Sequence, residues 1–281
     1  MRVRRFTEIA MRTVFFAAAL TSVLAVLFIC VFLFANGIPA MGEIGVFRFL
    51  LGTDWSPTDV PPSFGLLPMI VGSLTVTAGA VLIGVPVGVL TAVFLARACP
   101  AKLYRAVKPG VDLLAGIPSV VYGFFGMMVI MPAMGSSILS ASLLLGVMIL
   151  PTVVGLAESA LRAVPGAYYE GALALGAGHY RSVFRVVLPA ARSGVLAAVV
   201  LGVGRAIGET MAVIMVAGNQ ARMPVSLLKG ARTLTANIVL EMGYAEGLHR
   251  RALFATGVVL FVFILIINLS FSALKGRENR A

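Results

Sequence analysis

Six long apolar runs constrain the fold of this chain more than any other feature of its sequence. They lie at about residues 13–35, 67–96, 111–133, 138–157, 194–218 and 252–274. Each has close to the roughly 20 residues that a helix needs to cross the hydrocarbon of a bilayer. Inside lipid a helix pairs its own backbone polar groups, and runs this long do not fit the roughly ten-residue strands of a barrel. We therefore predict an all-α integral membrane protein with six transmembrane helices.

Composition excludes a soluble domain. Of the 281 residues, 60% are hydrophobic and 12% are charged, and the mean hydropathy is +1.03, so the chain cannot cover itself with a polar surface. The net charge of +11 does not indicate nucleic-acid binding, because the basic residues are scattered over short connections without interleaved aromatic residues. Membrane topology explains the charge better.

The distribution of basic residues predicts the orientation in the membrane. Most of the 22 Lys and Arg residues lie on the side that holds both termini. Since positive charge concentrates on the cytoplasmic side, we expect both termini in the cytoplasm, together with the connection at residues 158–192. The apolar run after the basic N-terminus is too long for the core of a signal peptide, so we predict that it is retained as the first span. Residues 1–281 then form one transmembrane domain.

The predicted cytoplasmic connection contains a long polar-faced stretch, Tyr169–Pro189. Its pattern predicts a helix at about residues 164–175 and a second, shorter helix at residues 179–187. Gly176 and Gly178 between them permit a sharp reversal of the chain. Such a projection at the membrane surface suits a groove on a partner protein. The alternative is an ordinary amphipathic connection.

Arg205 and Glu209 lie within the fifth predicted span, four residues apart, and so on one face of a continuous helix. A charge at that depth costs about 2.5–3.5 kcal/mol on insertion scales, so it faces a protein interior or an aqueous path. A guanidinium group matches the geometry of a phosphate or another oxyanion. We hypothesise that Arg205 contacts an anion during transport and that Glu209 is its counter-ion. A purely structural ion pair is the alternative.

The two predicted outer connections each carry a further hypothesis. The stretch at residues 36–65 is rich in proline and is a candidate docking surface for an extracytoplasmic partner. The alternative is that its tryptophan, Trp55, only anchors the chain at the membrane interface. In the second connection, Arg222, Lys229 and Arg232 could raise the local anion concentration at the entrance. The alternative is that they have no such role.

No catalytic or metal-binding constellation is visible in the sequence. His179 and His249 lack a companion at metal-ligand spacing, and we interpret both as solvated or packing residues. Asp112 and Glu158 are predicted to lie at span ends, near the interface. A phosphate-binding G-x-x-x-x-G-K-[ST] loop is absent from the sequence, so we expect no enzyme activity and no cofactor bound by this chain.

The resemblance to a known family rests on several segments. Tyr169–Pro189 resembles the EAA loop of ABC importer permeases, in which Glu-Ala-Ala is followed by a later Gly and then by Ile-x-Leu-Pro. Here Gly171 and Val186 are departures that preserve size and polarity. Four further segments are similar to the phosphate ABC importer permease family, and within it to the PstC-type subunit: residues 115–126 (AGIPSVVYGFFG), 188–219 (with RAIGETMAV), 234–243 and 248–269.

The resemblance implies a type I, MetI-like permease fold with cytoplasmic coupling helices, in the multi-pass membrane protein of a bacterial plasma or inner membrane. It implies that the substrate pathway includes Arg205, Glu209 and Thr210, and that phosphate is the substrate. The implied contact with the ATPase consists of the EAA-loop residues Glu170, Gly171, Ala172, Gly176, Leu188 and Pro189.

The same resemblance implies a set of partners. These are two copies of an ABC ATPase subunit that binds ATP and Mg²⁺, a second permease subunit of PstA type, an extracytoplasmic phosphate-binding protein and membrane lipid. Three alternatives stay open: a permease for another oxyanion such as molybdate or sulfate, the sister phosphate permease subunit, and a channel or carrier that needs no ATPase. Apart from Glu209, no acidic residue lies deep in a predicted span, which leaves little for proton or sodium coupling.

Overall fold

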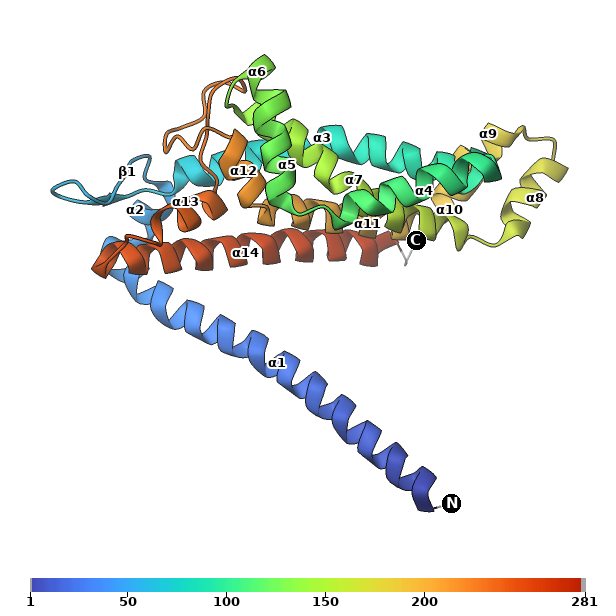
Figure 1. Cartoon of the computed structure of the whole chain (residues 1–281), viewed down its shortest axis with the longest axis horizontal. Coiled ribbons are helices and arrows are strands. Elements are labelled where there is room, and N and C mark those ends of the chain that lie inside the picture. Colours follow the sequence, from blue (N-terminus) through green and yellow to red (C-terminus); the bar gives the residue numbers. More distant parts are fainter. Residues whose placement is uncertain (1, 279–281) are drawn as a thin grey trace.

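The computed structural model describes the backbone of residues 2–278 and the side chains of residue 8 and residues 10–270. The basic residues that the topology prediction places at the extreme termini therefore lie outside the described side chains. The described backbone is almost entirely helical (Figure 1). The helices are α1 (Arg2–Ile44), α2 (Val46–Leu51), α3 (Leu67–Val93), α4 (Ala101–Gly116), α5 (Ser119–Phe125), α6 (Met131–Met134), α7 (Ile138–Arg162), α8 (Gly166–Ala174), α9 (His179–Ser182), α10 (Leu188–Ala190), α11 (Arg192–Gly208), α12 (Met211–Val216), α13 (Leu234–Glu241) and α14 (Gly247–Glu278).

Three π-helical turns interrupt these helices, and one small antiparallel sheet completes the fold. The turns are η1 (Phe94–Ala98), η2 (Gly126–Ile130) and η3 (Val183–Val187). In the sheet, β1 (Trp55–Ser56) pairs with β2 (Ser63–Phe64). The predicted first outer connection is thus mostly structured: α1 continues to Ile44, and α2 and the hairpin follow.

Four helices are long and apolar enough to cross a membrane: residues 10–44, 67–98, 138–162 and 247–270. Two bent helix pairs raise the number to as many as six, which agrees with the six predicted spans. The pair at residues 101–116 and 119–134 bends by 101°, so the helix is broken within the predicted span at 111–133. Ile117 is extended at the bend, because the proline that follows it disfavours helical backbone at the preceding residue.

The core lies between α3 and α7, which approach each other very closely. A Cβ at Gly79 would lie 2.4 Å from the Ser142 hydroxyl, and one at Gly84 would lie 2.6 Å from the Gly146 carbonyl. Glycine is therefore required where the two backbones meet.

Helix α1 leaves the bundle. Its C-terminal part packs against α14, where the rings of Phe32 and Phe254 meet edge to face at 5.5 Å. Its N-terminal part diverges from every other element (Figure 1), and its apolar side chains are exposed. A continuous apolar surface of this kind fits a helix in contact with lipid or with another membrane protein.

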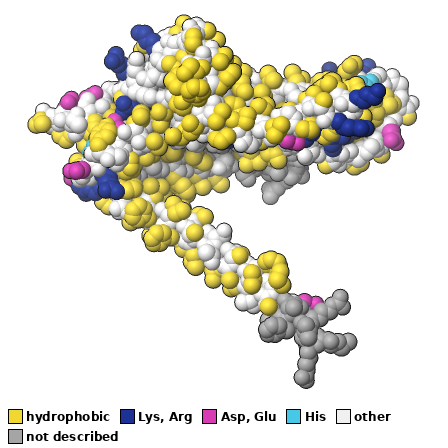
Figure 2. All heavy atoms as spheres, in the orientation of Figure 1, with side chains coloured by type: hydrophobic (Ala, Val, Ile, Leu, Met, Phe, Trp, Pro, Cys, Tyr) yellow, Lys and Arg dark blue, Asp and Glu magenta, His cyan; other side chains and the backbone are white. Residues whose placement is uncertain are grey.

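Charge and apolar surface are separated along the bundle. Figure 2 shows Lys and Arg side chains gathered toward the two ends, with hydrophobic side chains over the middle and along α1. One end holds α2, the hairpin and α13, and the other holds α8 and α9 (Figure 1). This distribution is the one expected of a protein that crosses a bilayer.

Candidate transport pathway and coupling loop

The predicted helix-turn-helix at residues 164–187 is present. Pro165 precedes the first turn of α8, and the helix ends at Ala174. Gly176 follows with φ +82°, a left-handed conformation that favours glycine. Gly178, by contrast, has φ −69° and begins α9 as an extended residue, so the reversal depends on Gly176 alone of the two glycines. We call residues 164–190 the coupling loop.

Buried apolar side chains fix the coupling loop to the rest of the bundle. Val183 and Val187 pack with Leu161 and with the end of α3. Arg97 Nη2 donates to the Leu161 carbonyl at 2.7 Å. His179 is a packing residue, since its Nδ1 is hydrogen-bonded to the Tyr169 hydroxyl at 2.7 Å and joins the two halves of the loop. The loop is therefore anchored to the ends of α3 and α7.

The far side of the coupling loop is exposed and partly apolar. Leu175 is 91% exposed, Tyr180 is 70% exposed, and Leu173 and Phe184 are also exposed. Of the predicted contact residues, Glu170, Gly171, Gly176 and Pro189 are exposed, Leu188 is half-buried and Ala172 is buried. Exposed apolar residues on a projection are typical of a docking surface.

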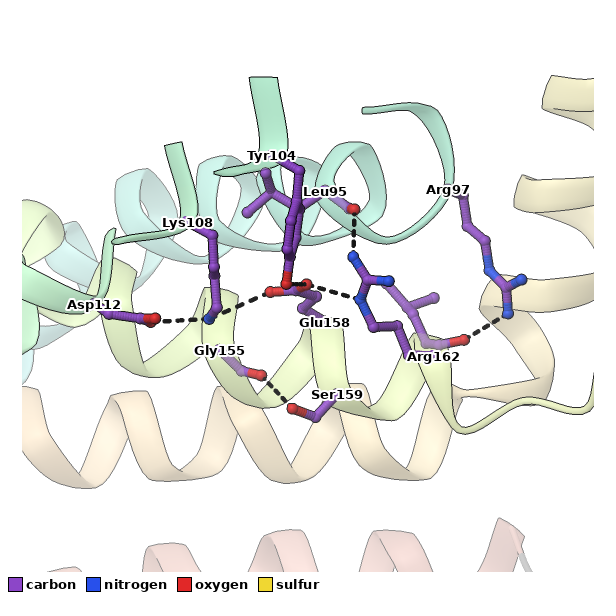
Figure 3. A network of polar contacts seen from close by, with 10 residues as sticks. Leu95, Arg97, Tyr104, Lys108, Asp112, Gly155, Glu158, Ser159 and Arg162 are labelled. Atoms are coloured by element: carbon purple, nitrogen blue, oxygen red, sulfur yellow. Dashed lines mark hydrogen bonds and ion pairs between the residues drawn. The ribbon is translucent and has the colours of Figure 1, made fainter. Parts of the chain in front are cut away.

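A buried carboxylate ties the base of the coupling loop to α4. Glu158 in α7 is only 3% exposed. Its Oε1 accepts hydrogen bonds from the Tyr104 hydroxyl and from Arg162 Nε, each at 2.8 Å, and its Oε2 lies 3.3 Å from Lys108 Nζ (Figure 3). Glu158 lies one turn before the end of α7, and it is buried in the protein there. Its charge is compensated by two cations and a hydroxyl, as a buried charge requires.

The same cluster extends to neighbouring elements. Lys108 also pairs with Asp112 at 2.9 Å, and Arg162 Nη2 donates to the Leu95 carbonyl at 2.9 Å (Figure 3). Leu95 lies in η1, at the end of α3. Polar contacts thus join α3, α4 and α7 beside the coupling loop.

Arg205 lies in the last turn of α11, and its side chain reaches α7. Its Nη1 donates to the Thr152 hydroxyl at 3.1 Å. Glu209 is not on the same helix face, because α11 ends at Gly208 and Glu209 is extended. Its Oε1 instead accepts a hydrogen bond from the Ala212 amide at 3.2 Å. The prediction of one continuous helix with Glu209 as the counter-ion of Arg205 is wrong for this conformation.

The break in the helix has local causes. Gly208 is a poor helix former. The Glu209 side chain accepts a hydrogen bond from the Ala212 amide at the start of α12. The Glu209 carbonyl accepts from the Thr235 hydroxyl at 3.1 Å, and the Thr210 hydroxyl donates to the Gly208 carbonyl at 3.2 Å. Side-chain bonds of this kind compete with helical ones. Glu209 and Thr210 therefore form a joint between α11 and α12.

A second buried carboxylate joins the two outer connections. Glu241 accepts from Trp55 Nε1 at 2.8 Å, is hydrogen-bonded to His249 Nε2 at 2.8 Å and pairs with Arg232. Trp55 is 6% exposed, so the interpretation of this residue as an interfacial anchor does not hold. Arg232 is engaged by Glu241 as well, which weakens the hypothesis that it attracts anions. Burial raises the pKa of the nearby Tyr244 hydroxyl above its usual value. The negative charge of Glu241 also raises this pKa, whereas the positive charge of Arg232 lowers it.

Sequence reasoning missed Thr152, Glu158 and Glu241 as interaction centres. For Glu158 a signal was present, since Arg162 follows it by four residues, the spacing of a helical ion pair. Trp55 lies 186 residues from Glu241, and Arg205 lies 53 residues from Thr152. No local pattern indicates contacts over such distances.

Comparison with known proteins agrees with these features. Residues 84–279 match the family described as "Binding-protein-dependent transport system inner membrane component". The chain is 38% identical to the "Probable ABC transporter permease protein YqgH" of Bacillus subtilis, over 94% of this chain and 91% of the relative. It is 34% identical to the "Phosphate transport system permease protein PstC" of Mesorhizobium japonicum, over 94% and 89% of the two chains.

Solved structures share the fold. A chain of a bacterial alginate ABC transporter superposes with a TM-score of 0.68 at 17% identity, and the match covers 97% of each chain. A chain of the MetNI methionine ABC transporter, in an inward-facing conformation, gives a TM-score of 0.64 at 21% identity over 75% of this chain and 95% of that one. The chain belongs to the family of binding-protein-dependent transport system inner membrane components, as an ABC transporter permease subunit related to the PstC proteins.

Proposed function

We propose that this chain forms the phosphate pathway of an ATP-driven importer. The observation that carries the proposal is Arg205, a cation near the end of the apolar helix α11 whose guanidinium is held, among the described residues, by a neutral hydroxyl and not by a carboxylate. Its positive charge is therefore free to attract an oxyanion. The named PstC relatives, at 32–35% identity, support phosphate as that oxyanion.

Uptake of labelled phosphate tests the proposal. Membrane vesicles that hold this chain with its partner subunits should accumulate phosphate when ATP is supplied at the cytoplasmic face, because the ATPase drives the cycle. Excess unlabelled phosphate should abolish the signal, whereas sulfate and molybdate should compete weakly. Strong competition by sulfate or molybdate would favour the second candidate, a permease for another oxyanion. Uptake without ATP would favour a channel or carrier.

The coupling loop is proposed to bind one of two ATPase subunits, which hold the ATP and Mg²⁺ that this chain does not bind. The support is its exposed apolar tip at Leu175 and Tyr180, and its firm attachment to α3 and α7. Closure of the ATPases would move the loop, and the polar cluster around Glu158 would pass the movement to α4. The remaining partners of the proposal are a PstA-type permease subunit and an extracytoplasmic phosphate-binding protein, with both termini of this chain in the cytoplasm.

Site-directed cross-linking checks both the ATPase contact and the orientation. In a chain with Cys30 and Cys99 changed to Ser, Leu175→Cys is expected to cross-link to the ATPase subunit, because Leu175 is the most exposed apolar residue of the loop. Val60→Cys is the matched control, since Val60 is 98% exposed on the hairpin connection at the opposite end of the bundle. Labelling of Leu175→Cys by a thiol reagent confined to the outside would contradict the proposed topology.

A further inference from the structure

The Thr152 hydroxyl is oriented differently from other hydroxyls in the membrane helices. Thr75 donates to the carbonyl of Val71, and Thr256 donates to that of Ala252, in the usual bond to a residue four positions earlier. Among the described residues, the Thr152 side chain takes part in one hydrogen bond, which its hydroxyl oxygen accepts from Arg205 Nη1. A hydroxyl has one hydrogen to donate besides its acceptor lone pairs. The Thr152 hydrogen is therefore available to a ligand.

Open space lies beside this pair. A Cβ built on Gly155, one turn along α7 from Thr152, meets no atom within 4 Å, and the same holds for Gly204 and Gly208, which flank Arg205 on α11. Thr152 and Arg205 are themselves half-buried. The two polar groups thus border a surface on which this chain leaves room for a small ion.

The neighbouring carboxylate does not neutralise the pair. Glu209 Oε1 is occupied by the Ala212 amide, and Glu158, two turns further along α7, is paired with Lys108 and Arg162. Two hydrogen-bond donors therefore remain at one place: the hydroxyl of Thr152 and the unoccupied N–H groups of Arg205. Donors of this kind, one of them charged, match an oxyanion, which only accepts hydrogen bonds when fully ionised.

We propose that Thr152 is a second anion-contacting residue of the pathway, and that it acts with Arg205 as a single two-residue contact for a tetrahedral oxyanion. The inference rests on the proposed function and adds a residue from α7 to it. Thr152 has two effects: it holds the guanidinium through its lone pair, and it donates its own hydrogen to the passing anion. A relative movement of α7 and α11 would separate the two donors and release the anion.

The test compares three variants in the whole transporter, with inorganic phosphate as the probe. Thr152→Val preserves the shape but removes the hydroxyl, Thr152→Ser preserves the hydroxyl, and Thr75→Val removes a hydroxyl that is bonded within its own helix. A hydrogen bond to a charged group is worth enough to change a rate about tenfold. We expect Thr152→Val to lower the maximal rate of phosphate uptake about tenfold, with the half-saturating phosphate concentration unchanged. Thr152→Ser and Thr75→Val should keep an uptake rate near that of the unaltered transporter.

A double variant tests whether the two residues act together. If they form one contact, Thr152→Val added to Arg205→Gln should cause little further loss. Uptake by Thr152→Val at the unaltered rate, or equal losses in Thr152→Val and Thr75→Val, would overturn the inference while leaving phosphate transport itself intact. Failure of the proposed function is seen separately, as absence of uptake by the unaltered transporter. Should Thr152→Val not assemble, Thr152→Ala takes its place, because it removes the hydroxyl without adding volume.

Discussion

Arg205→Gln is expected to lower ATP-driven phosphate uptake by about 10- to 100-fold. A charge-assisted hydrogen bond contributes about 1.5–3 kcal/mol, and each 1.4 kcal/mol is a factor of ten. Glutamine can still contact Thr152 but loses the positive charge. Arg205→Lys should be intermediate, since lysine restores the charge without the planar fork that fits two oxyanion oxygens. Uptake of labelled phosphate, corrected for the amount of assembled transporter, measures the effect.

Two matched variants make this result specific. Arg105→Gln removes a cation from the exposed surface of α4, so its uptake should be normal. Glu209→Gln retains an oxygen that can accept from the Ala212 amide, so it should cost much less than Arg205→Gln. A loss in Glu209→Gln as large as that in Arg205→Gln would instead support the counter-ion hypothesis, in a conformation other than the one described here. Normal uptake by Arg205→Gln would refute an anion-contacting role for Arg205.

Glu158→Gln is expected to destabilise the protein by about 1.5–3 kcal/mol, the range for a hydrogen bond to a charged group, because the cations left behind, Lys108 and Arg162, are 23% and 47% exposed. Loss of the carboxylate leaves the two cations Lys108 and Arg162 close together without the negative charge of Glu158, with which both are paired. Glutamine can still accept from Tyr104, so packing changes little. The thermal unfolding midpoint of the purified complex should fall clearly, and uptake should fall with it, because the contact between α4 and the base of the coupling loop is weakened.

Asp112→Asn is the matched control within the same cluster. Asp112 pairs with the same Lys108, but its side chain is 60% exposed, and exposed ion pairs contribute about 0–1 kcal/mol. Its unfolding midpoint should therefore stay close to that of the unaltered chain. Equal shifts for the two variants would mean that burial of Glu158 does not set the strength of the network.

The sequence alone determined the features that arise from local physics. Apolar runs of about 20 residues predicted membrane helices, since an unpaired backbone is too costly in lipid. Gly176 marked the reversal of the coupling loop, because few other residues adopt a positive φ without strain. In each case the preference of a short segment was enough.

Only the tertiary structure decided which side chains meet. Local spacing paired Arg205 with Glu209, whereas the fold breaks the helix between them and gives Arg205 a hydroxyl 53 residues away. Glu158 and Glu241 were unremarkable in sequence, but each became buried and gathered partners from separate elements, with Trp55 reaching Glu241 across 186 residues. The physical reason is that a buried charge must be compensated wherever the packing of helices brings a donor within about 3 Å, and that packing depends on the whole chain rather than on any segment of it.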